Sequence, residues 1–166
     1  TQVAAEAEGQ LEPCHGLSIA AKRELASFVS TLGRNDAALG DLRRVLQQAA
    51  RCLPNEHIEV LRTRAAICRV LADAGRYDVA AEAIDPLLAD VVESLGDRHL
   101  LWLSVQADRM RVHAAHRLGE QFLDECQRLL SQASETFGST SPYVVEIRQQ
   151  YSLSHQAWRE SSVADD

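Results

Sequence analysis

The pentapeptide Leu53-Pro54-Asn55-Glu56-His57 defines the repeat register of this chain, because similar pentapeptides recur at a fixed interval. It returns 42 residues later as Leu95-Gly96-Asp97-Arg98-His99. It is already present as Leu11-Glu12-Pro13-Cys14-His15, and Phe137-Gly138-Ser139-Thr140-Ser141 continues the series. A period of this size is typical of a solenoid in which each repeat is one supersecondary unit. The sequence therefore predicts a repeat architecture.

Between these markers, apolar residues recur at the spacing of amphipathic helices, and no long stretch alternates as a strand would. Glycine and proline end the helices, while Asn35-Asp36 and Ser141-Pro142 are expected to cap helix starts. The sequence thus predicts an all-α fold with two helices in each repeat. The predicted helices span about 17–32, 36–51, 57–74, 78–94, 99–116, 120–137 and 142–158.

The apolar positions also predict which face of each helix is buried. On the first helix this face is predicted to comprise Leu17, Leu25, Phe28, Val29 and Leu32. On the helices that follow, the predicted faces include Leu39, Leu42, Val45, Leu46 and Ala49, then Leu61, Ala65, Ile67, Cys68, Leu71 and Ala72, then Ala80, Ile84, Leu87, Leu88 and Val91. Later faces include Leu103, Ala107, Met110 and Ala114, then Phe122, Cys126, Leu129 and Leu130, and finally Val145, Ile147 and Tyr151.

The register divides the chain into successive repeats. Residues 11–52, 53–94 and 95–137 form three repeats, residues 138–159 form a final helix, and residues 160–166 form a frayed polar tail. Residues 1–10 look like the end of a preceding helix, since Val3 and Ala7 match Val45 and Ala49 at the repeat offset. We therefore expect the chain to come from a longer array.

Two local motifs resemble the tetratricopeptide repeat (TPR) family: the Gly-Arg-Tyr-Asp-x-Ala turn at 75–80 and the Leu-Gly-Asp-x-His closure at 95–99. The 42-residue period resembles the kinesin-light-chain-like variety, and the segment 80–99 resembles bacterial, in particular actinobacterial, arrays. The resemblance implies a right-handed helical-hairpin solenoid of about three and a half repeats. It also implies a scaffold that binds peptides or protein segments on its concave face.

Composition limits the classes of function. The net charge of −7 argues against affinity for nucleic acid or anionic membranes. No apolar run approaches the length of a transmembrane helix, so we expect a cytoplasmic protein. Cys14, Cys52, Cys68 and Cys126 show no metal-ligand spacing, and reduced thiols are the prediction for all four.

No catalytic motif is present, and the chain is predicted not to be an enzyme. His15, His57 and His99 occupy equivalent positions in successive repeats, where the favoured interpretation is a loop or helix-capping residue. His113 and His116 share one helix face, but no third ligand accompanies them. Neither a metal nor a cofactor is predicted.

The candidate binding face lies on the first helix of each repeat, which lines the inner surface if the resemblance holds. Its predicted peptide-binding residues are Arg23, Ser27, Arg62, Arg69, Ser104 and Arg111. Arginine recognises carboxylates and phosphates through paired hydrogen bonds, which favours an acidic or C-terminal segment as the ligand. In the alternative interpretation, these arginines form ordinary salt bridges with Glu59, Asp73 and Asp108 on the same helices.

The sequence thus predicts a protein- or peptide-binding TPR scaffold that serves as a regulatory segment of a larger intracellular protein. One alternative is a regulatory domain that senses a small ligand or a signalling peptide. Another is a module that self-associates through exposed repeat ends, giving a homo-oligomer.

Overall fold

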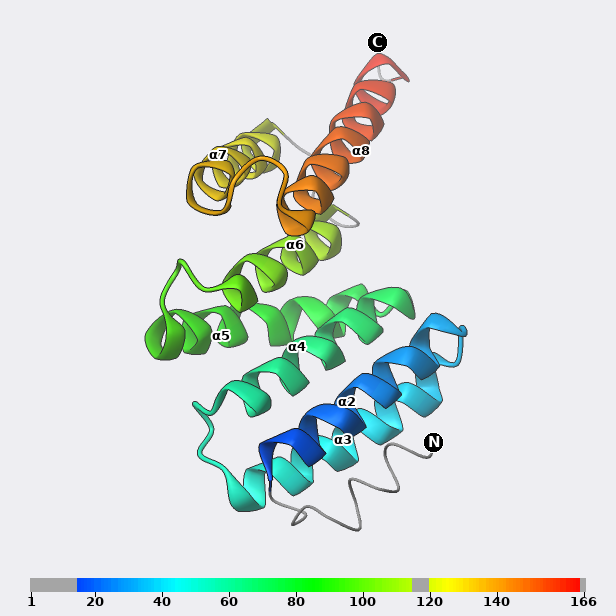
Figure 1. The fold of residues 1–166 in the computed structure, drawn as a ribbon. Coiled ribbons are helices and arrows are strands. Elements are labelled where there is room, and N and C mark those ends of the chain that lie inside the picture. Colours follow the sequence, from blue (N-terminus) through cyan, green and yellow to red (C-terminus); the bar gives the residue numbers. More distant parts are fainter. Residues whose placement is uncertain (1–14, 115–119, 165–166) are drawn as a thin grey trace. The chain divides into compact units, whose positions relative to one another are not determined.

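The computed structural model describes residues 15–114 and 120–164, and this part of the chain is built of helices and their connections. The helices, coloured along the chain in Figure 1, are α2 (Gly16–Thr31), α3 (Asn35–Cys52), α4 (Ile58–Asp73), α5 (Tyr77–Leu95), α6 (Leu100–Ala114), α7 (Glu120–Phe137) and α8 (Pro142–Ala164). The all-α prediction is confirmed. The last two residues of the helix predicted at 99–116 lie outside the described residues.

The chain divides into two compact units, residues 1–94 and 95–166, at the predicted boundary between the second and third repeats. In the first unit, α2 packs against α3, and both of these helices pack against α4. In the second unit, α8 packs against both α6 and α7. Neighbouring helices in the sequence therefore pack together, as expected for helical hairpins.

Glycine forms the turn within each hairpin of the first unit. Gly33 and Gly75 have φ angles of +76° and +71°, in the left-handed region that glycine enters without steric penalty. The next residue then folds back: the N–H of Arg34 donates to the carbonyl of Val29 at 3.3 Å, and that of Arg76 to Leu71 at 2.9 Å. These bonds satisfy carbonyls that the helix end leaves open.

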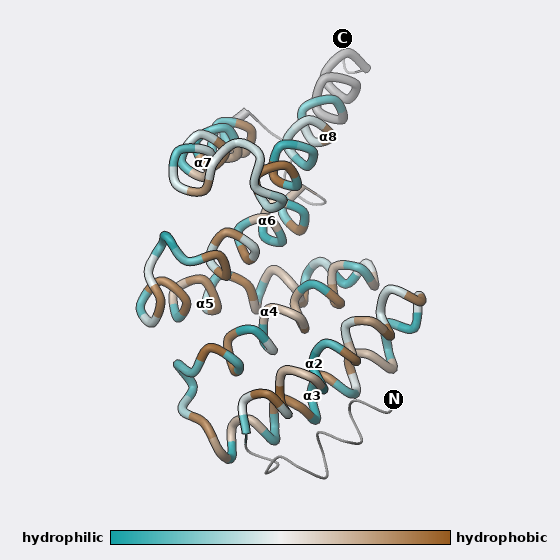
Figure 2. Tube along the Cα trace, viewed as in Figure 1, coloured by the Kyte–Doolittle hydropathy of each residue, from teal (hydrophilic) through white to brown (hydrophobic). Residues whose placement is uncertain are grey.

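The core of the first unit joins three helices. Ile19 of α2, Val45 and Ala49 of α3, and Val60 of α4 form one buried cluster, with Leu46 and Leu53 packed against it. Burying one such aliphatic side chain stabilises the fold by about 1.5–3 kcal/mol. Hydrophobic and hydrophilic positions recur along the helices in Figure 2. α3 and α5 bury one face each, whereas α6 buries the consecutive residues 101–105 and is enclosed on most sides. The predicted buried positions of α5 are all confirmed.

The predicted buried face of α2 is wrong. Most of its large apolar residues are exposed: Leu17 is 65% exposed, Leu25 42%, Phe28 59% and Leu32 61%. The residues that α2 buries are instead Ser18, Ile19, Ala26 and Ser30. The helix carries two apolar faces, and the one that follows the register of Leu61 and Cys68 is the one packed in the core.

Three local expectations at helix ends are also corrected. The residue at the N-cap of α3 is Arg34, whose side chain makes no capping hydrogen bond. Asn35, which was expected to cap this helix, instead accepts from the Ser30 hydroxyl through its carboxamide oxygen at 2.7 Å. In α8, Val144 is fully buried whereas Val145 is 47% exposed. The helix also continues to Ala164, beyond its predicted end at about residue 158, since no glycine or proline interrupts its final turns.

The cysteines do not all follow the reduced-thiol prediction. Cys52, at the end of α3, is disulfide-bonded, whereas Cys68 and Cys126 are buried free thiols. The remaining cysteine, Cys14, lies outside the described residues. Cysteine spacing did not indicate this bond, because disulfide partners are selected by proximity in the fold.

Candidate functional site

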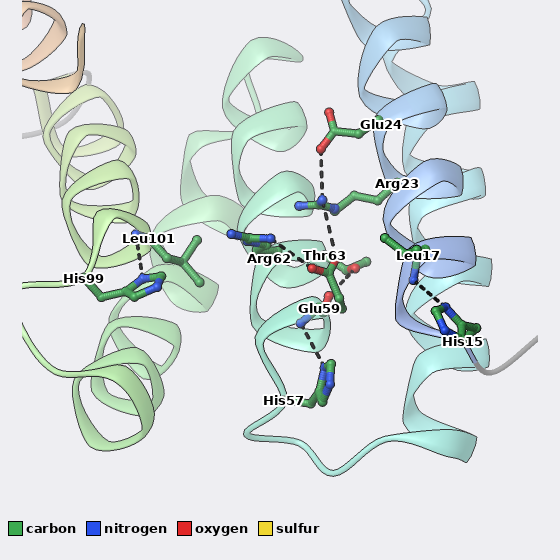
Figure 3. Close-up of polar contacts among 10 residues, drawn as sticks. All are labelled: His15, Leu17, Arg23, Glu24, His57, Glu59, Arg62, Thr63, His99 and Leu101. Carbon is green, nitrogen blue, oxygen red and sulfur yellow. Dashed lines mark hydrogen bonds and ion pairs between the residues drawn. The ribbon is translucent and has the colours of Figure 1, made fainter. Parts of the chain in front are cut away.

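Three histidines start the first helix of successive repeats in the same way. The Nδ1 atoms of His15, His57 and His99 accept hydrogen bonds from the backbone N–H two residues later, at 3.3, 3.2 and 3.0 Å. Figure 3 shows each imidazole beside its donor. The capping interpretation of these histidines is confirmed.

The described residues offer little for metal chemistry. Among residues 15–114 and 120–164, no group of three or more His, Cys, Asp or Glu side chains is placed to hold a metal ion. His113 lies on α6, while its predicted neighbour His116 lies outside the described residues. A search of the described helices found none that is long and apolar enough to cross a membrane.

The polar centre of the first unit is a carboxylate held between two arginines from neighbouring helices. Glu59 of α4 accepts from Arg62 Nη1 at 3.0 Å and lies 3.5 Å from Arg23 Nη2 of α2. Arg23 also pairs with the exposed Glu24 at 2.9 Å. Figure 3 shows both guanidinium groups beside the carboxylate of Glu59. Two of the predicted peptide-binding arginines thus meet at one residue.

This cluster is largely shielded from solvent but incompletely hydrogen-bonded. The side chains of Arg23 and Glu59 are 12% and 10% exposed, whereas that of Arg62 is 41% exposed. The buried atoms Arg23 Nε and Glu59 Oε2 have no hydrogen-bond partner. Buried polar atoms without partners are energetically costly. These two atoms could therefore form hydrogen bonds that the fold itself does not make.

The other predicted site residues occupy different environments. Ser27 is half-buried on α2, and Arg69 is exposed on α4. In the second unit, Ser104 is only 8% exposed, and Arg111 donates to Asp108 on the same helix at 3.2 Å. The pairs of Arg62 with Glu59 and of Arg111 with Asp108 are the same-helix salt bridges of the alternative interpretation.

A second polar pattern, which the sequence did not predict, links the two helices of each hairpin in the first unit. Lys22 donates to Gln48 at 3.2 Å, and Arg64 donates to Asp90 at 2.6 Å. The two pairs are separated by the 42-residue period at both ends. The repeat register therefore contained this pattern of polar pairs, but only the apolar positions were used to predict contacts.

Comparisons with known proteins give a likeness in structure alone. No protein-family model matches the chain, and no curated protein matches it. Solved structures do: a putative kinesin light chain of Podosopora anserina with nearly identical TPR-like repeats has a TM-score of 0.69 and 21% identity. A second structure, of a variant of the same protein, has a TM-score of 0.71 at the same identity. These matches cover 99% of this chain and 78% and 77% of the respective structures. The chain therefore has the fold of a TPR-like helical-repeat protein.

Proposed function

We propose that this protein is a binding scaffold whose first helices present arginines to an extended, carboxylate-bearing segment of a partner. TPR-like repeat folds generally serve protein–protein interaction, and this supports the broad function. The observation that carries the finer proposal is the arrangement of Arg23 and Arg62 around the single carboxylate of Glu59. The two guanidinium groups share the largely buried Glu59, and the second carboxylate that balances their charge, Glu24, is exposed.

The partially exposed groups determine how such a ligand would bind. Glu24 is 70% exposed, so its pair with Arg23 is of the solvent-screened kind that contributes little. A ligand carboxylate would replace Glu24 at little cost and bind Arg62 from the solvent side. Arg69, exposed on the same helix, extends the basic character along α4.

A direct test measures the binding of a fluorescent peptide of alternating Glu and Leu with a free carboxyl terminus. Charge reversal by Arg69→Glu should weaken binding by roughly 5-fold or more, since one rim charge is worth on the order of 1 kcal/mol. The matched control is Arg43→Glu, which makes the same charge change at an exposed position of α3. Binding should also weaken with added salt.

Two further probes identify the recognised group. The same peptide with Gln in place of Glu, and the peptide with an amidated terminus, separate side-chain from terminal carboxylate recognition. Equal affinity for the native protein, Arg69→Glu and Arg43→Glu would mean that Arg69 takes no part in binding the peptide.

A second candidate function is self-association through α2. Leu17 and Phe28 are 65% and 59% exposed, although the corresponding positions of the next repeat, Glu59 and Val70, are 7% and 3% exposed. The face of α2 therefore has the character of a surface on which another helical hairpin stacks. Sedimentation at increasing concentration should reveal an oligomer that Phe28→Ser removes. A monomer at every concentration would exclude this second function.

The predicted cytoplasmic location stays a prediction. The disulfide at Cys52 weighs against it, because such bonds persist mainly in oxidising compartments. The predicted regulatory role and the bacterial source likewise rest on the sequence resemblance.

A further inference from the structure

The third repeat contains a pocket between its two helices. It lies between α6 and α7 within the second unit, and its volume is about 260 Å³. Met110, Cys126 and Leu129 give it apolar walls, and these side chains are 5%, 1% and 9% exposed. The amides of Gln106 and Gln132 add polar groups.

The repeat register shows how the lining of this pocket differs from the second repeat. One period earlier, Leu71 and Ile84 are 3% and 0% exposed, so these positions hold buried aliphatic side chains in the second repeat. In the third repeat the same positions carry His113 and Cys126. From the second to the third repeat, Ile84 is thus replaced by a smaller side chain and Leu71 by a polar one. At two other lining positions the third repeat carries the larger residue, Met110 in place of Cys68 and Phe122 in place of Ala80. The pocket is therefore lined by a set of side chains that differs from that of the second repeat.

The charges around the pocket favour an anion. The pocket is lined by two arginines, Arg109 and Arg128, and one acid, Glu125. The formal net charge of its lining is therefore 2 − 1 = +1, with histidine counted as neutral. The chain as a whole carries −7. The ion pair of Arg109 with Glu125, at 2.6 Å, ties α6 to α7 beside the pocket. Such a fixed polar group next to apolar walls is typical of small-ligand sites.

The volume sets the size of the ligand. A cavity of about 150 Å³ accommodates benzene, so the present pocket has room for a ring or branched chain with one additional polar group. From these observations we propose that the pocket between α6 and α7 binds a small monoanionic carboxylate with an aromatic or branched apolar body. The apolar body packs on Met110 and Leu129, and the carboxylate lies towards Arg128 and the two glutamine amides. This is a site of the kind that a ligand-sensing domain requires, and it is separate from the arginines proposed to bind peptide.

The test is a titration of the isotopically labelled full chain with phenylacetate and isovalerate, followed by two-dimensional NMR. Phenylacetamide and isovaleramide serve as neutral analogues of the same shape. We expect amide signals of α6 and α7 to shift with a Kd on the order of 0.1–1 mM, as suits ligands of this size. The neutral analogues should bind at least several-fold more weakly.

Two variants separate the pocket from unspecific binding. Cys126→Ile restores the residue of the second repeat, fills the pocket, and should abolish the shifts while the protein remains folded. Arg128→Gln should weaken phenylacetate binding several-fold and leave phenylacetamide unchanged, whereas the control Arg43→Gln on α3 should change neither. The proposal is overturned if no signals shift, if Cys126→Ile binds as before, or if both analogues bind equally. None of these results bears on peptide binding by Arg69.

Discussion

Replacing the buried ion pair of α2 and α4 by the residues of neighbouring repeats would show how charge is tolerated inside the first unit. Arg23 corresponds in register to Ala65, and Glu59 corresponds to Leu101. The variants Arg23→Ala, Glu59→Leu and their combination therefore substitute side chains that the repeat already accepts elsewhere.

The structure gives the expected magnitudes. Charges 3.5 Å apart attract by about 5 kcal/mol at an effective dielectric constant near 20, but burying each ion costs several kcal/mol. Glu59→Leu alone leaves the largely buried Arg23 with only the exposed Glu24 as a counter-charge. We expect it to lower the free energy of unfolding by about 2–3 kcal/mol, less than for a fully buried pair because Arg62 is 41% exposed. The double variant should return to within about 1 kcal/mol of the native protein, since Arg23 Nε and Glu59 Oε2 lack hydrogen-bond partners.

Urea unfolding followed by circular dichroism measures all four proteins in one double-mutant cycle. Each kcal/mol should also shift the Tm by roughly 2–4 °C for a chain of this length. The matched control is Asp41→Ala, which removes an exposed pair with Arg44 and should cost no more than about 1 kcal/mol. Simple additivity of Arg23→Ala and Glu59→Leu would refute the reasoning, because it would mean that the two charges do not depend on each other.

Three further outcomes are expected. His57→Ala should cost about 1 kcal/mol in urea unfolding while His57→Asn retains most of the cap, and equal losses would contradict capping. Gly75→Ala should cost about 1–2 kcal/mol because its φ is +71°, whereas Gly40→Ala, within α3, should be neutral or stabilising. Burial raises the pKa of Cys126 from 9.0 to about 12, so the folded state retains the proton that the unfolded state loses. The stability from this group is present below pH 9 and is lost as the pH rises towards 12, and Cys126→Ala should abolish that portion of the alkaline loss.

Helix positions were predictable because their determinants are local. Glycine at 33 and 75 marks helix ends through its own backbone angle, and the capping histidines contact residues only two positions away. The buried positions of α3 and α5 followed from periodicity for the same reason. Such signals do not depend on what lies next to the helix.

The predictions that were wrong or incomplete depend on contacts between helices. The choice between the two apolar faces of α2 depends on its packing partners, so Leu17 and Phe28 were misplaced. The candidate site was predicted only in part: Arg23 was placed on the binding face, but its approach to Glu59 on another helix has no signal in local spacing. The disulfide of Cys52 was missed for the same reason.

The histidine caps have a consequence for folding kinetics. Each joins a ring nitrogen to the backbone N–H two residues away, so the start of that helix is specified before any distant contact forms. Helix packing between sequence neighbours extends this locality to the hairpins. Chains with such low contact order close only short loops on the way to the native state. We therefore expect fast folding that begins in whichever hairpin first orders, and that spreads to its neighbours along the chain.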